Sequence, residues 1–491
     1  FCNQSLTVIK FIYFRLGNLR LEYLEDVMFI GRKEELSELE RLYSSDKFEF
    51  AVIYGRRRVG KTSLIREFCR GKRAFYFVAR EAEGASNLKM AAEEMASQGL
   101  IQTGTYFKDW SALLDAVGAA SAAKRMILAI DEYPYLAAGE KSISSILQTH
   151  IDGKLKDGRL FLILCGSSMS FMENQILGHK SPLYGRRTIQ LKVKPFGFFE
   201  AREFLSGFSP EEQAALYGAT GGVPEYLGGI DNGESMDGNL TRLFFKESGR
   251  LYEEPSNLLK QELREPALYN SVIASIAGGA SRLNEIATGV GMESNAASRY
   301  VNALMSLGIL KKETPVSEKP GRRSIYSIAD NMFRFWYRFV FPNMSAIEAG
   351  AGEVVWRNKV AGGLSQFMGG VFENICLEYL WAMQKRDRLP VAAGRMGRWW
   401  GNNPVLKRQD EVDILAIDGD AALLGECKWR SAVSLDVLTT LRERGDIFDV
   451  RRRYFYIFAK NGFEEPLLRE AARDRSVSLL TLAGMIDDIV E

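Results

Sequence analysis

Short apolar runs alternate with longer amphipathic stretches through the first half of the chain. Between Phe29 and Ile230 these runs are FAVIYG, AFYFVA, MILAID, LFLILCGSS and TIQLKVKPF. Continuous apolar runs of this length are typical of strands buried on both faces. Strands that alternate with helical segments form parallel sheets. The pattern therefore predicts an α/β fold with a parallel sheet and flanking helices.

The pattern changes after the segment GGVPEYLGGI, which ends at Ile230. Helical spacing dominates residues 235–330, which finish in a short β-rich piece. Residues 360–491 mix helical spacing with the strand-like runs EVDILAI, AALLGECKW and YFYIFAK. We therefore predict three domains, over residues 28–230, 235–330 and 360–491.

The first 27 residues do not fit this scheme. They begin with Phe, and their apolar part, VIKFIYF, is short and interrupted by Lys10. A signal peptide needs a longer apolar region followed by a small-residue cleavage site. We interpret residues 1–27 as an extension ahead of a natural start at Met28, and we expect a cytoplasmic protein with no membrane partner.

Composition narrows the chemistry more than the fold. The formal net charge of +2 gives no general attraction to nucleic acid, so any such attraction must come from local patches. The five cysteines are scattered without a CxxC pair, which argues against a disulfide framework and a zinc site. With two histidines, a His-based metal cluster or Ser-His-Asp triad is not expected. Carboxylates, Lys, Ser/Thr and backbone amides remain.

The segment YGRRRVGKTS matches the phosphate-binding pattern GxxxxGK[ST], between a predicted strand and a predicted helix. Glycines let backbone N–H groups wrap phosphate oxygens, and a helix N-terminus favours an anion. We expect Lys61 to reach the β- and γ-phosphates of a nucleotide and Thr62 to help hold Mg²⁺. The expected nucleotide contacts of this loop are Gly55, Arg56, Arg57, Arg58, Val59, Gly60, Lys61, Thr62 and Ser63.

Two further strand ends carry polar residues suited to nucleotide hydrolysis. The run RMILAIDEYPYL places Asp131 as a Mg²⁺ carboxylate and Glu132 as the group that polarises the attacking water. An acidic pair that caps the following helix is the alternative. The run LFLILCGSS ends in Ser167 and Ser168, where a polar residue can sense the γ-phosphate, although serine is also common in turns.

At this point the chain resembles the archaeal-type ATPases, which belong to the AAA+-related STAND class found in archaea and bacteria. The resemblance rests on FIGRKEEL, the phosphate-binding loop, LAIDEYPYL, the GSS strand end, SPLYGRRT and GGVPEYL, in this order. It implies that Gly31, Arg32 and Pro224 lie near the nucleotide base. It also makes Arg186 or Arg187 a candidate arginine finger, with surface ion pairing as the alternative. No guanine-specifying NKxD segment is present, which favours ATP.

The segment SRLNEIATGVGMESNAASRYVNALMSLGILKKE contains two helical patterns separated by the turn GVGME. A possible β-hairpin with a basic tip follows, in KKETPVSEKPGRRSIYSI. This order predicts a winged-helix domain with Arg299, Arg322 and Arg323 as DNA contacts. A winged helix that serves only as a packing module is the alternative.

Three charges interrupt the last predicted strand pair: Asp413, Glu426 and Lys428. Charges inside a sheet are costly unless they are paired or bind a metal ion. With Glu373 on a preceding amphipathic helix, the spacing D-x₁₂-E-x-K resembles the PD-(D/E)XK nuclease core. The resemblance implies a restriction-endonuclease-like domain in which Asp413 and Glu426 ligate Mg²⁺ and Lys428 orients water. The proline that often precedes the first Asp is Val412 here, and a buried ion pair of Lys428 is the alternative.

This nuclease-like region also resembles the C-terminal domain of unknown function that is typical of the same ATPase family, on the segments GRWWGN and GECKW. The preceding segment, QKRDRLPVAAGRMGRWW, combines Arg395 and Arg398 with two tryptophans. Such a composition suits contact with a nucleic-acid backbone and base stacking, and it suits a solvated surface equally well.

The sequence thus predicts an ATP- and Mg²⁺-dependent prokaryotic ATPase that acts on nucleic acid. In this hypothesis ATP turnover controls a metal-dependent nuclease-like domain, DNA is the expected partner, and self-association is a further expectation. The alternative is a nucleotide-dependent regulatory switch or scaffold whose C-terminal domain binds DNA or a protein without cleaving.

Overall fold

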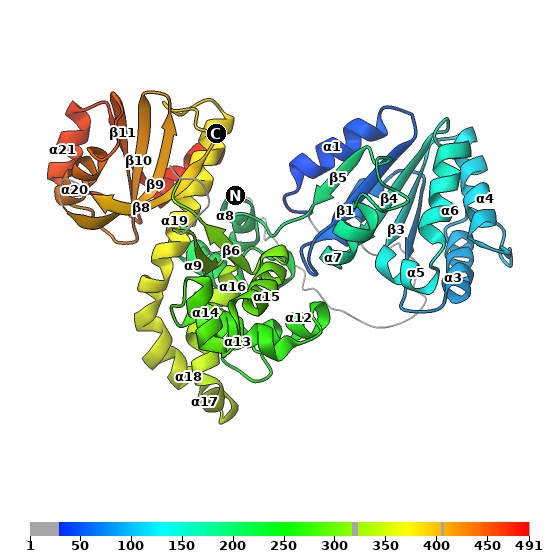
Figure 1. The fold of residues 1–491 in the computed structure, drawn as a ribbon, viewed down its shortest axis with the longest axis horizontal. Coiled ribbons are helices and arrows are strands. Elements are labelled where there is room, and N and C mark those ends of the chain that lie inside the picture. The colour runs from blue at the N-terminus through cyan, green and yellow to red at the C-terminus, as the bar shows by residue number, and fades with distance from the viewer. Residues whose placement is uncertain (1–28, 317–322, 404–406, 491) are drawn as a thin grey trace, which may run out of the picture. The chain divides into compact units, whose positions relative to one another are not determined.

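The computed structural model describes residues 29–316, 323–403 and 407–490 (Figure 1). The chain divides into a first compact unit that ends at Pro195 and a second that runs Phe196–Glu491. Each unit contains its own five-stranded sheet. The extension 1–27 and Arg322 lie outside the described residues. The segment GGVP belongs to the second unit, although the predicted ATPase domain extends to residue 230.

The sheet of the first unit is entirely parallel, with the order β2-β3-β4-β1-β5. Its strands are β1 (Glu49–Tyr54), β2 (Ala74–Val78), β3 (Met126–Asp131), β4 (Leu160–Gly166) and β5 (Ile189–Lys192). The helical elements are α1 (Lys33–Tyr43), α2 (Lys61–Cys69), α3 (Gly84–Ser97), α4 (Trp110–Ala123), α5 (Tyr133–Gly139), α6 (Ile143–His150), η2 (Ile151–Leu155), α7 (Met169–Phe171) and η3 (Met172–Ile176). The predicted α/β class is confirmed.

Hydrophobic burial accounts for this arrangement. Every residue of β1, β3 and β4 is buried, as expected for central strands covered on both faces. Helices α1 and α2 pack on one face through Leu39, Leu64 and Phe68, which share a core with side chains of β1, β3 and β4. Figure 1 shows α3, α4 and α6 on the opposite face.

The strand order decides where the polar strand ends meet. Parallel strands β1, β4 and β3 are neighbours, and their carboxyl ends lie at one edge of the sheet. The phosphate-binding loop leaves β1 at this edge, Asp131 ends β3, and Ser167 follows β4. Ligands of open α/β sheets bind at this edge of the strands.

The second unit begins with a largely helical region. Its elements are α8 (Phe198–Ala201), η4 (Arg202–Leu205), α9 (Pro210–Thr220), α10 (Pro224–Leu227), α11 (Met236–Phe244), α12 (Glu254–Glu262), α13 (Pro266–Ala277), α14 (Leu283–Val290), α15 (Ser294–Ser306), the hairpin β6 (Leu310–Glu313) and β7 (Ile325–Ile328), α16 (Asn331–Phe335), η5 (Trp336–Val340), η6 (Phe341–Asn343), α17 (Met344–Glu348), α18 (Gly352–Val355), η7 (Trp356–Val360) and α19 (Ala361–Lys385). The aromatic segment FRFWYRFVF, from Phe333 to Phe341, thus continues helix α16.

The C-terminal part of the second unit is a mixed sheet with the order β12-β11-β10-β9-β8. Strands β8, β9 and β10 are antiparallel neighbours, whereas β10, β11 and β12 are parallel. Its elements are β8 (Met396–Asn403), β9 (Arg408–Asp418), β10 (Ala421–Lys428), α20 (Leu435–Gly445), β11 (Arg452–Ala459), α21 (Glu465–Arg473), β12 (Val477–Thr481) and α22 (Leu482–Val490).

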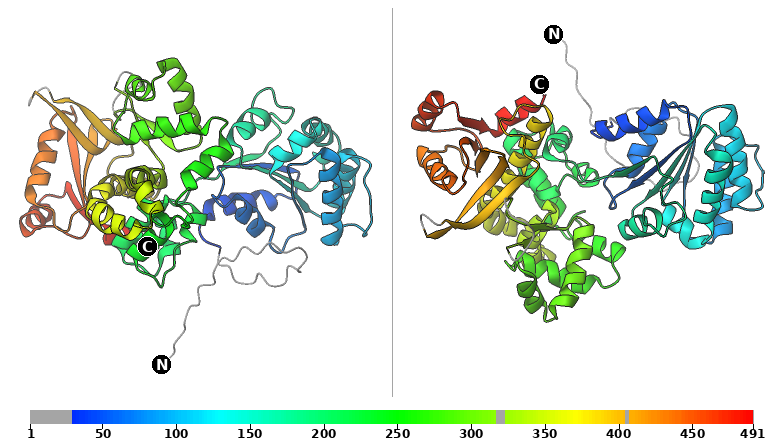
Figure 2. Two further views of the ribbon diagram at one scale, coloured as in Figure 1. Left: turned by 90° about the horizontal axis from the view of Figure 1, so that it is seen from below. Right: turned by 45° about the horizontal axis from the view of Figure 1, so that its top comes forward.

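Helices cover both faces of this mixed sheet. Leu438 and Leu441 of α20 and Leu467 of α21 share a core with apolar residues of the strands. On the other face, the ring of Phe372 from α19 contacts Trp429, and that of Tyr379 contacts Phe458. Figures 1 and 2 show the yellow helix α19 and the orange-to-red helices α20 and α21 on these opposite faces. None of the helices in the described ranges combines the length and hydropathy of a membrane span.

Candidate functional site

The phosphate-binding loop depends on two glycines. Gly60 has φ 90° and directly precedes α2, so the loop turns sharply into the helix. A Cβ on Gly55 would lie 2.3 Å from the carbonyl oxygen of Val193, which leaves no room for a side chain. Lys61 is buried, and its Nζ donates to the carbonyl of Arg56 at 2.9 Å. The lysine ammonium is therefore held against the loop that the sequence assigns to phosphates.

The other loop residues differ in their surroundings. Val59 packs in the core under the sheet, whereas Thr62 and Ser63 at the start of α2 are exposed. Arg58 adopts φ 71°, and the Arg57 guanidinium donates to the Tyr135 hydroxyl at 3.0 Å. Two hydroxyl-bearing residues at the start of α2 are thus exposed where a nucleotide phosphate is expected.

Asp131 is the centre of a hydrogen-bond network at the end of β3. Its Oδ2 accepts from the Thr62 hydroxyl at 2.7 Å and from the Tyr76 hydroxyl at 2.8 Å, and its Oδ1 accepts from the backbone N–H of Glu132. The structure thus brings together the two residues that the sequence assigns to Mg²⁺. Tyr76 was missed, because alternation within β2 does not reveal which side chain reaches the neighbouring strand end.

Burial and the nearby Asp131 carboxylate both raise the pKa of Tyr76, so its hydroxyl stays protonated and acts as a donor. This phenol fixes the orientation of the carboxylate beside Thr62. Tyr76 is therefore a positioning residue for Asp131.

Glu132 occupies an unusual backbone conformation, with φ 51°. Its side chain does not cap helix α5, which it directly precedes. Instead, Glu132 Oε2 accepts from the Ser167 hydroxyl at 2.9 Å, so Ser167 at the end of β4 holds the carboxylate. This geometry disfavours the capping alternative and joins two strand ends that the sequence marked separately.

Arg32 links the segment before α1 to the phosphate-binding loop. Its guanidinium donates to the Val59 carbonyl at 3.0 Å and to the Lys194 carbonyl, and it pairs with Glu35. Gly31 and Arg32 both have positive φ, so the chain turns sharply at this point. The contact of these two residues with a nucleotide base stays a prediction.

The two arginine-finger candidates have different environments. Arg186 is bound by Asp152 through two hydrogen bonds of 2.6 and 2.7 Å. Within the described chain, Arg187 has no such partner, so it is the better candidate of the two. Pro224 begins α10 in the second unit, and its contact with the nucleotide base stays a prediction.

In the second unit, Glu426 and Lys428 lie on β10, and the Lys428 ammonium donates to Glu426 Oε1 at 2.6 Å. The other carboxylate oxygen accepts from Arg444 of α20 at 2.9 Å. Glu426 therefore has a cation on each oxygen. Arg444 was missed, because nothing in the sequence of α20 indicates a link to β10.

Asp413 and Glu373 form a second acidic environment. Asp413 on β9 accepts from the backbone N–H of Cys427 at 2.8 Å. Burial, Glu426 and Glu373 raise the pKa of Asp413 to about 7, and burial also raises the pKa of Glu373 on α19. These carboxylates thus repel one another, which is the electrostatic condition that a bound cation relieves.

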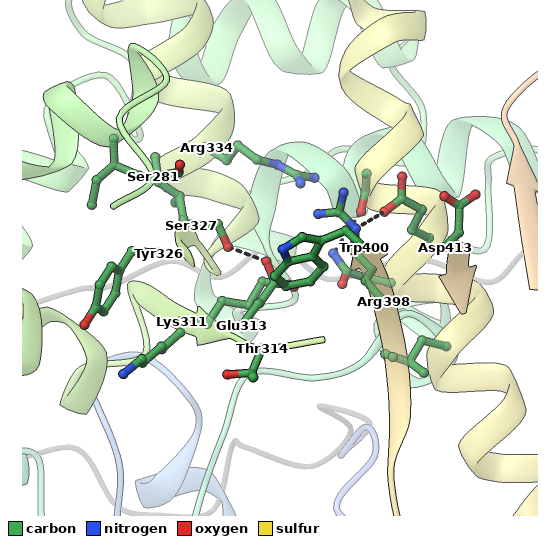
Figure 3. A pocket seen from close by; sticks show the side chains of 18 of the residues that line it. Ser281, Lys311, Glu313, Thr314, Tyr326, Ser327, Arg334, Arg398, Trp400 and Asp413 are labelled. Atoms are coloured by element: carbon green, nitrogen blue, oxygen red, sulfur yellow. Dashed lines mark hydrogen bonds and ion pairs between the residues drawn. The ribbon is translucent and has the colours of Figure 1, made fainter. Parts of the chain in front are cut away.

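A pocket of about 850 Å³ adjoins these acids. Its walls come from the β6–β7 hairpin, α16, α19, β8 and β9. Figure 3 shows Arg334, Arg398 and Asp413 projecting into it from three different elements. Glu373 also lines the pocket, and its Oε2 lies 3.8 Å from Arg398 Nε. Two of the predicted nuclease acids, Glu373 and Asp413, therefore line one cavity with Arg398 of β8, whereas Glu426 does not line it.

The two predicted DNA contacts that the structure describes, Arg299 and Arg323, lie on different elements. Arg299 is exposed on α15, and Arg323 is exposed just before β7. At the end of the described part of the β6 arm, the Val316 N–H donates to the Arg398 carbonyl of β8 at 3.1 Å. This contact joins the hairpin to the C-terminal sheet and makes it one wall of the pocket.

Comparison with known proteins agrees with this organisation. Residues 29–230 match the family model of an ATPase domain predominantly from Archaea, and residues 336–440 match that of archaeal and bacterial proteins of unknown function. The uncharacterized protein MJECL04 of Methanocaldococcus jannaschii is 33% identical over 422 residues, which cover 85% of this chain and 91% of the relative. The chain belongs to this archaeal-type ATPase family. Residues 29–230, which contain the phosphate-binding loop, form the ATPase domain of this family.

Two further comparisons cover smaller shares of the chain. The Walker-type ATPase PABY2304 of Pyrococcus abyssi has the same fold over 63% of this chain and 96% of its own, with a TM-score of 0.50 and 21% identity. The uncharacterized ATP-binding protein MJ0423 of Methanocaldococcus jannaschii is 53% identical over 47 residues, or 10% of this chain and 80% of the relative. The predicted resemblance to archaeal-type ATPases with a C-terminal domain of unknown function is confirmed.

Proposed function

We propose that this ATPase acts on nucleic acid, and that ATP turnover controls Mg²⁺-dependent cleavage in the C-terminal domain. One observation carries the proposal: Asp413 and Glu373 line the same pocket as basic and aromatic side chains, one strand away from Glu426 and Lys428. The element order supports the proposal, because α19, β9 and β10 carry the four residues predicted for the nuclease core. DNA is the proposed substrate.

Asp413 and Glu426 differ in how readily each could bind a divalent cation. Asp413 lies among carboxylates that raise its pKa, so a cation beside it would remove an unfavourable repulsion. Glu426 would first have to exchange Lys428 or Arg444 for the ion. The described residues contain no group of three or more His, Cys, Asp or Glu side chains placed to hold a metal. We therefore propose a Mg²⁺ site with two carboxylate ligands, in which Asp413 is the main ligand and Glu426 is the second.

In this proposal the protein supplies position and charge. A bound Mg²⁺ would polarise the scissile phosphodiester. Lys428 is held by Glu426 at the end of β10, where its ammonium can orient water or neutralise developing charge. Arg398 contributes a further positive charge in the pocket. In the P-loop domain, Thr62 and Asp131 would hold the nucleotide's Mg²⁺, because their oxygens already lie in hydrogen-bond contact.

A second candidate function has its own support. The paired oxygens of Glu426 favour the ion-pair alternative, in which Lys428 and Arg444 only stabilise the sheet. The ATPase would then be a nucleotide-dependent switch that binds DNA or a protein without cleaving it. The contact of the β6–β7 arm with β8 likewise favours a packing role for the proposed winged helix.

One assay separates the two functions. Purified ATPase is incubated with labelled DNA, Mg²⁺ or Mn²⁺, and with or without ATP, and the products are scored for cleavage and for a shifted complex. We expect cleavage that depends on the divalent ion and is lost in Asp413→Ala. A shifted complex without cleavage under every condition would contradict the nuclease proposal and support the switch.

A further inference from the structure

Arg334 of α16 forms no direct ion pair in the described chain, and the Glu373 carboxylate only partly offsets the effect of burial on its pKa. Its Nε and Nη2 are buried without a hydrogen-bond partner among the described residues. Its guanidinium lies 4.9 Å from the ring centroid of Phe367, and burial lowers its pKa. A buried, unpaired cation is unfavourable unless an anion compensates it.

Three other cations along this pocket have a polar or charged partner close by, whereas the exposed Lys312 lies over the ring of Tyr326. The described contacts are Lys311 with Glu313 at 2.7 Å, Arg338 with Gln366 at 2.6 Å, and Arg398 with Glu411 at 3.3 Å and Glu373 at 3.8 Å. Arg334 lines the same pocket with two of its nitrogens unpartnered in the described chain. Guanidinium groups bind phosphate through two parallel hydrogen bonds, and a rotation of the Arg334 side chain would turn its covered Nε and Nη2 toward a phosphate in the pocket.

An aromatic surface lies in the same pocket. Trp400 of β8 is half-buried there, and the Arg398 guanidinium lies 6.0 Å from its ring centroid. Figure 3 shows Trp400 among the side chains that line the cavity. Cavities of roughly 300–1,000 Å³ hold small ligands. The volume of about 850 Å³ is therefore ample for a nucleotide unit. Indole rings stack on the open faces of bases in single strands. In a duplex the neighbouring base pairs cover these faces.

We propose that this pocket binds one nucleotide of a single-stranded nucleic acid, with its phosphate on Arg334 and its base stacked on Trp400. The inference rests on the proposed nucleic-acid function and names the form of the substrate. Asp413 lines the same pocket, so a phosphodiester held by Arg334 would be presented beside the proposed cleavage site. Neither Arg334 nor the choice of a single strand follows from the nuclease resemblance.

Binding of a fluorescein-labelled oligothymidylate to the full chain, followed by anisotropy in EDTA, tests the proposal without any cleavage. We expect Arg334→Gln to weaken binding about 10-fold and to reduce the slope of log affinity against log salt by about 0.7. Arg469→Gln is the matched control, because Arg469 is exposed on α21 and does not line the pocket. Its affinity should equal that of the parent.

Trp400→Ala tests the stacking partner. It should weaken oligothymidylate binding about 10-fold and leave an abasic strand of equal length and charge unaffected. Parental affinity in Arg334→Gln, or equal losses for the thymidylate and abasic strands in Trp400→Ala, would overturn the proposal. A duplex whose binding is weakened by Trp400→Ala as much as that of the single strand would overturn it too.

The proposal remains testable if Arg334→Gln does not fold. Arg334→Lys keeps the charge but loses the two-pronged donor, and we expect it to bind about 5-fold more weakly than the parent. Parental affinity in Arg334→Lys would then overturn the proposal. Cleavage is scored separately with Mg²⁺, so a chain that binds the strand through Arg334 but never cuts would contradict only the nuclease proposal.

Discussion

At the scale of single residues, the two carboxylates of the ATPase site differ in how many side chains hold them by hydrogen bonds. Asp131 is held by Thr62 and Tyr76, whereas among the described side chains only that of Ser167 holds the Glu132 carboxylate. A carboxylate that must polarise water needs mobility as well as position. Glu132 has fewer constraints than Asp131, which suits it to the hydrolytic step rather than to ion binding.

We expect Glu132→Gln to retain ATP binding and to lower the rate of ATP hydrolysis at least about 100-fold, because only the water-polarising group is lost. Phosphate release and the binding of a fluorescent ATP analogue measure the two effects. Ser167→Ala should show a smaller loss of rate, and Ser168→Ala should show none, because Glu132 bonds to Ser167. Hydrolysis by Glu132→Gln at the parental rate would refute this role.

Substitutions of the two proposed nuclease carboxylates, Asp413 and Glu426, should change the free energy of unfolding by different amounts. Glu426→Gln removes the counter-charge of both Lys428 and Arg444, whose side chains are 34% and 18% exposed. We expect a loss of about 2 kcal/mol, less than for a fully buried pair. Asp413→Asn keeps an acceptor for the Cys427 N–H and relieves carboxylate repulsion at pH 8, so its stability should stay within about 0.5 kcal/mol of the parent or rise.

Urea unfolding in EDTA, followed by tryptophan fluorescence, measures this difference in the second unit. Seven tryptophans occur in the chain, and all except Trp110 follow Pro195. The nearby acid Glu411 on β9 provides the control, because its side chain is largely exposed and Glu411→Gln should therefore change stability little. Equal losses in Asp413→Asn and Glu426→Gln would favour the ion-pair alternative for both residues.

At the scale of elements, helix α19 organises the second unit. It supplies Glu373 to the pocket, packs against the mixed sheet, and places Glu378 at the start of α8. Glu378 accepts from the backbone N–H groups of Phe198 and Phe199 at 2.9 and 3.3 Å. One helix thus connects the first turn of the second unit to its last sheet.

This connection should depend on pH. Burial raises the pKa of Glu378 to about 7 from its ordinary 4.5, so the folded state holds the proton more tightly than the unfolded state. Folding stability should therefore fall as pH rises from about 4.5 to about 7, by on the order of 3 kcal/mol, and level off above.

Glu378→Gln cannot ionise, so it should flatten this decline. Urea midpoints of the second unit at pH 5 and pH 8 measure the change in the parent and the variant. Glu353 on α18 is exposed, and Glu353→Gln should keep the parental pH dependence. An identical decline in the parent and Glu378→Gln would show that other groups cause it.

At the scale of the whole molecule, the proposed function requires the ATPase unit to influence the C-terminal domain. Lys61→Ala removes the cation expected at the nucleotide phosphates. We expect this variant to keep the folded C-terminal domain but to lose any difference in cleavage with and without ATP. Cleavage time courses with ATP and with no nucleotide measure it. A persistent ATP effect in Lys61→Ala would contradict control through this site.

Some of this organisation could be predicted from the sequence because it is local. The phosphate-binding loop combines a strand, glycines and a helix start within one segment, so its residues and conformation follow from near neighbours. The buried runs of β1, β3 and β4 likewise predict a parallel sheet, since continuous apolar strands require cover on both faces. Asp413 and Glu426 could be singled out in the same way, because a charge within an apolar strand is visible in the sequence itself.

Only the tertiary structure decided which distant side chains meet. The partnership of Tyr76 with Asp131, and that of Arg444 with Glu426, depend on how strands and helices pack across long sequence separations. Arg334 carried a usable signal, as a charge within an aromatic helical segment, but the lack of a partner for its buried nitrogens in the described chain is a property of the packed pocket. The sequence determined the kinds of groups available, and packing determined which of them remain available to a ligand.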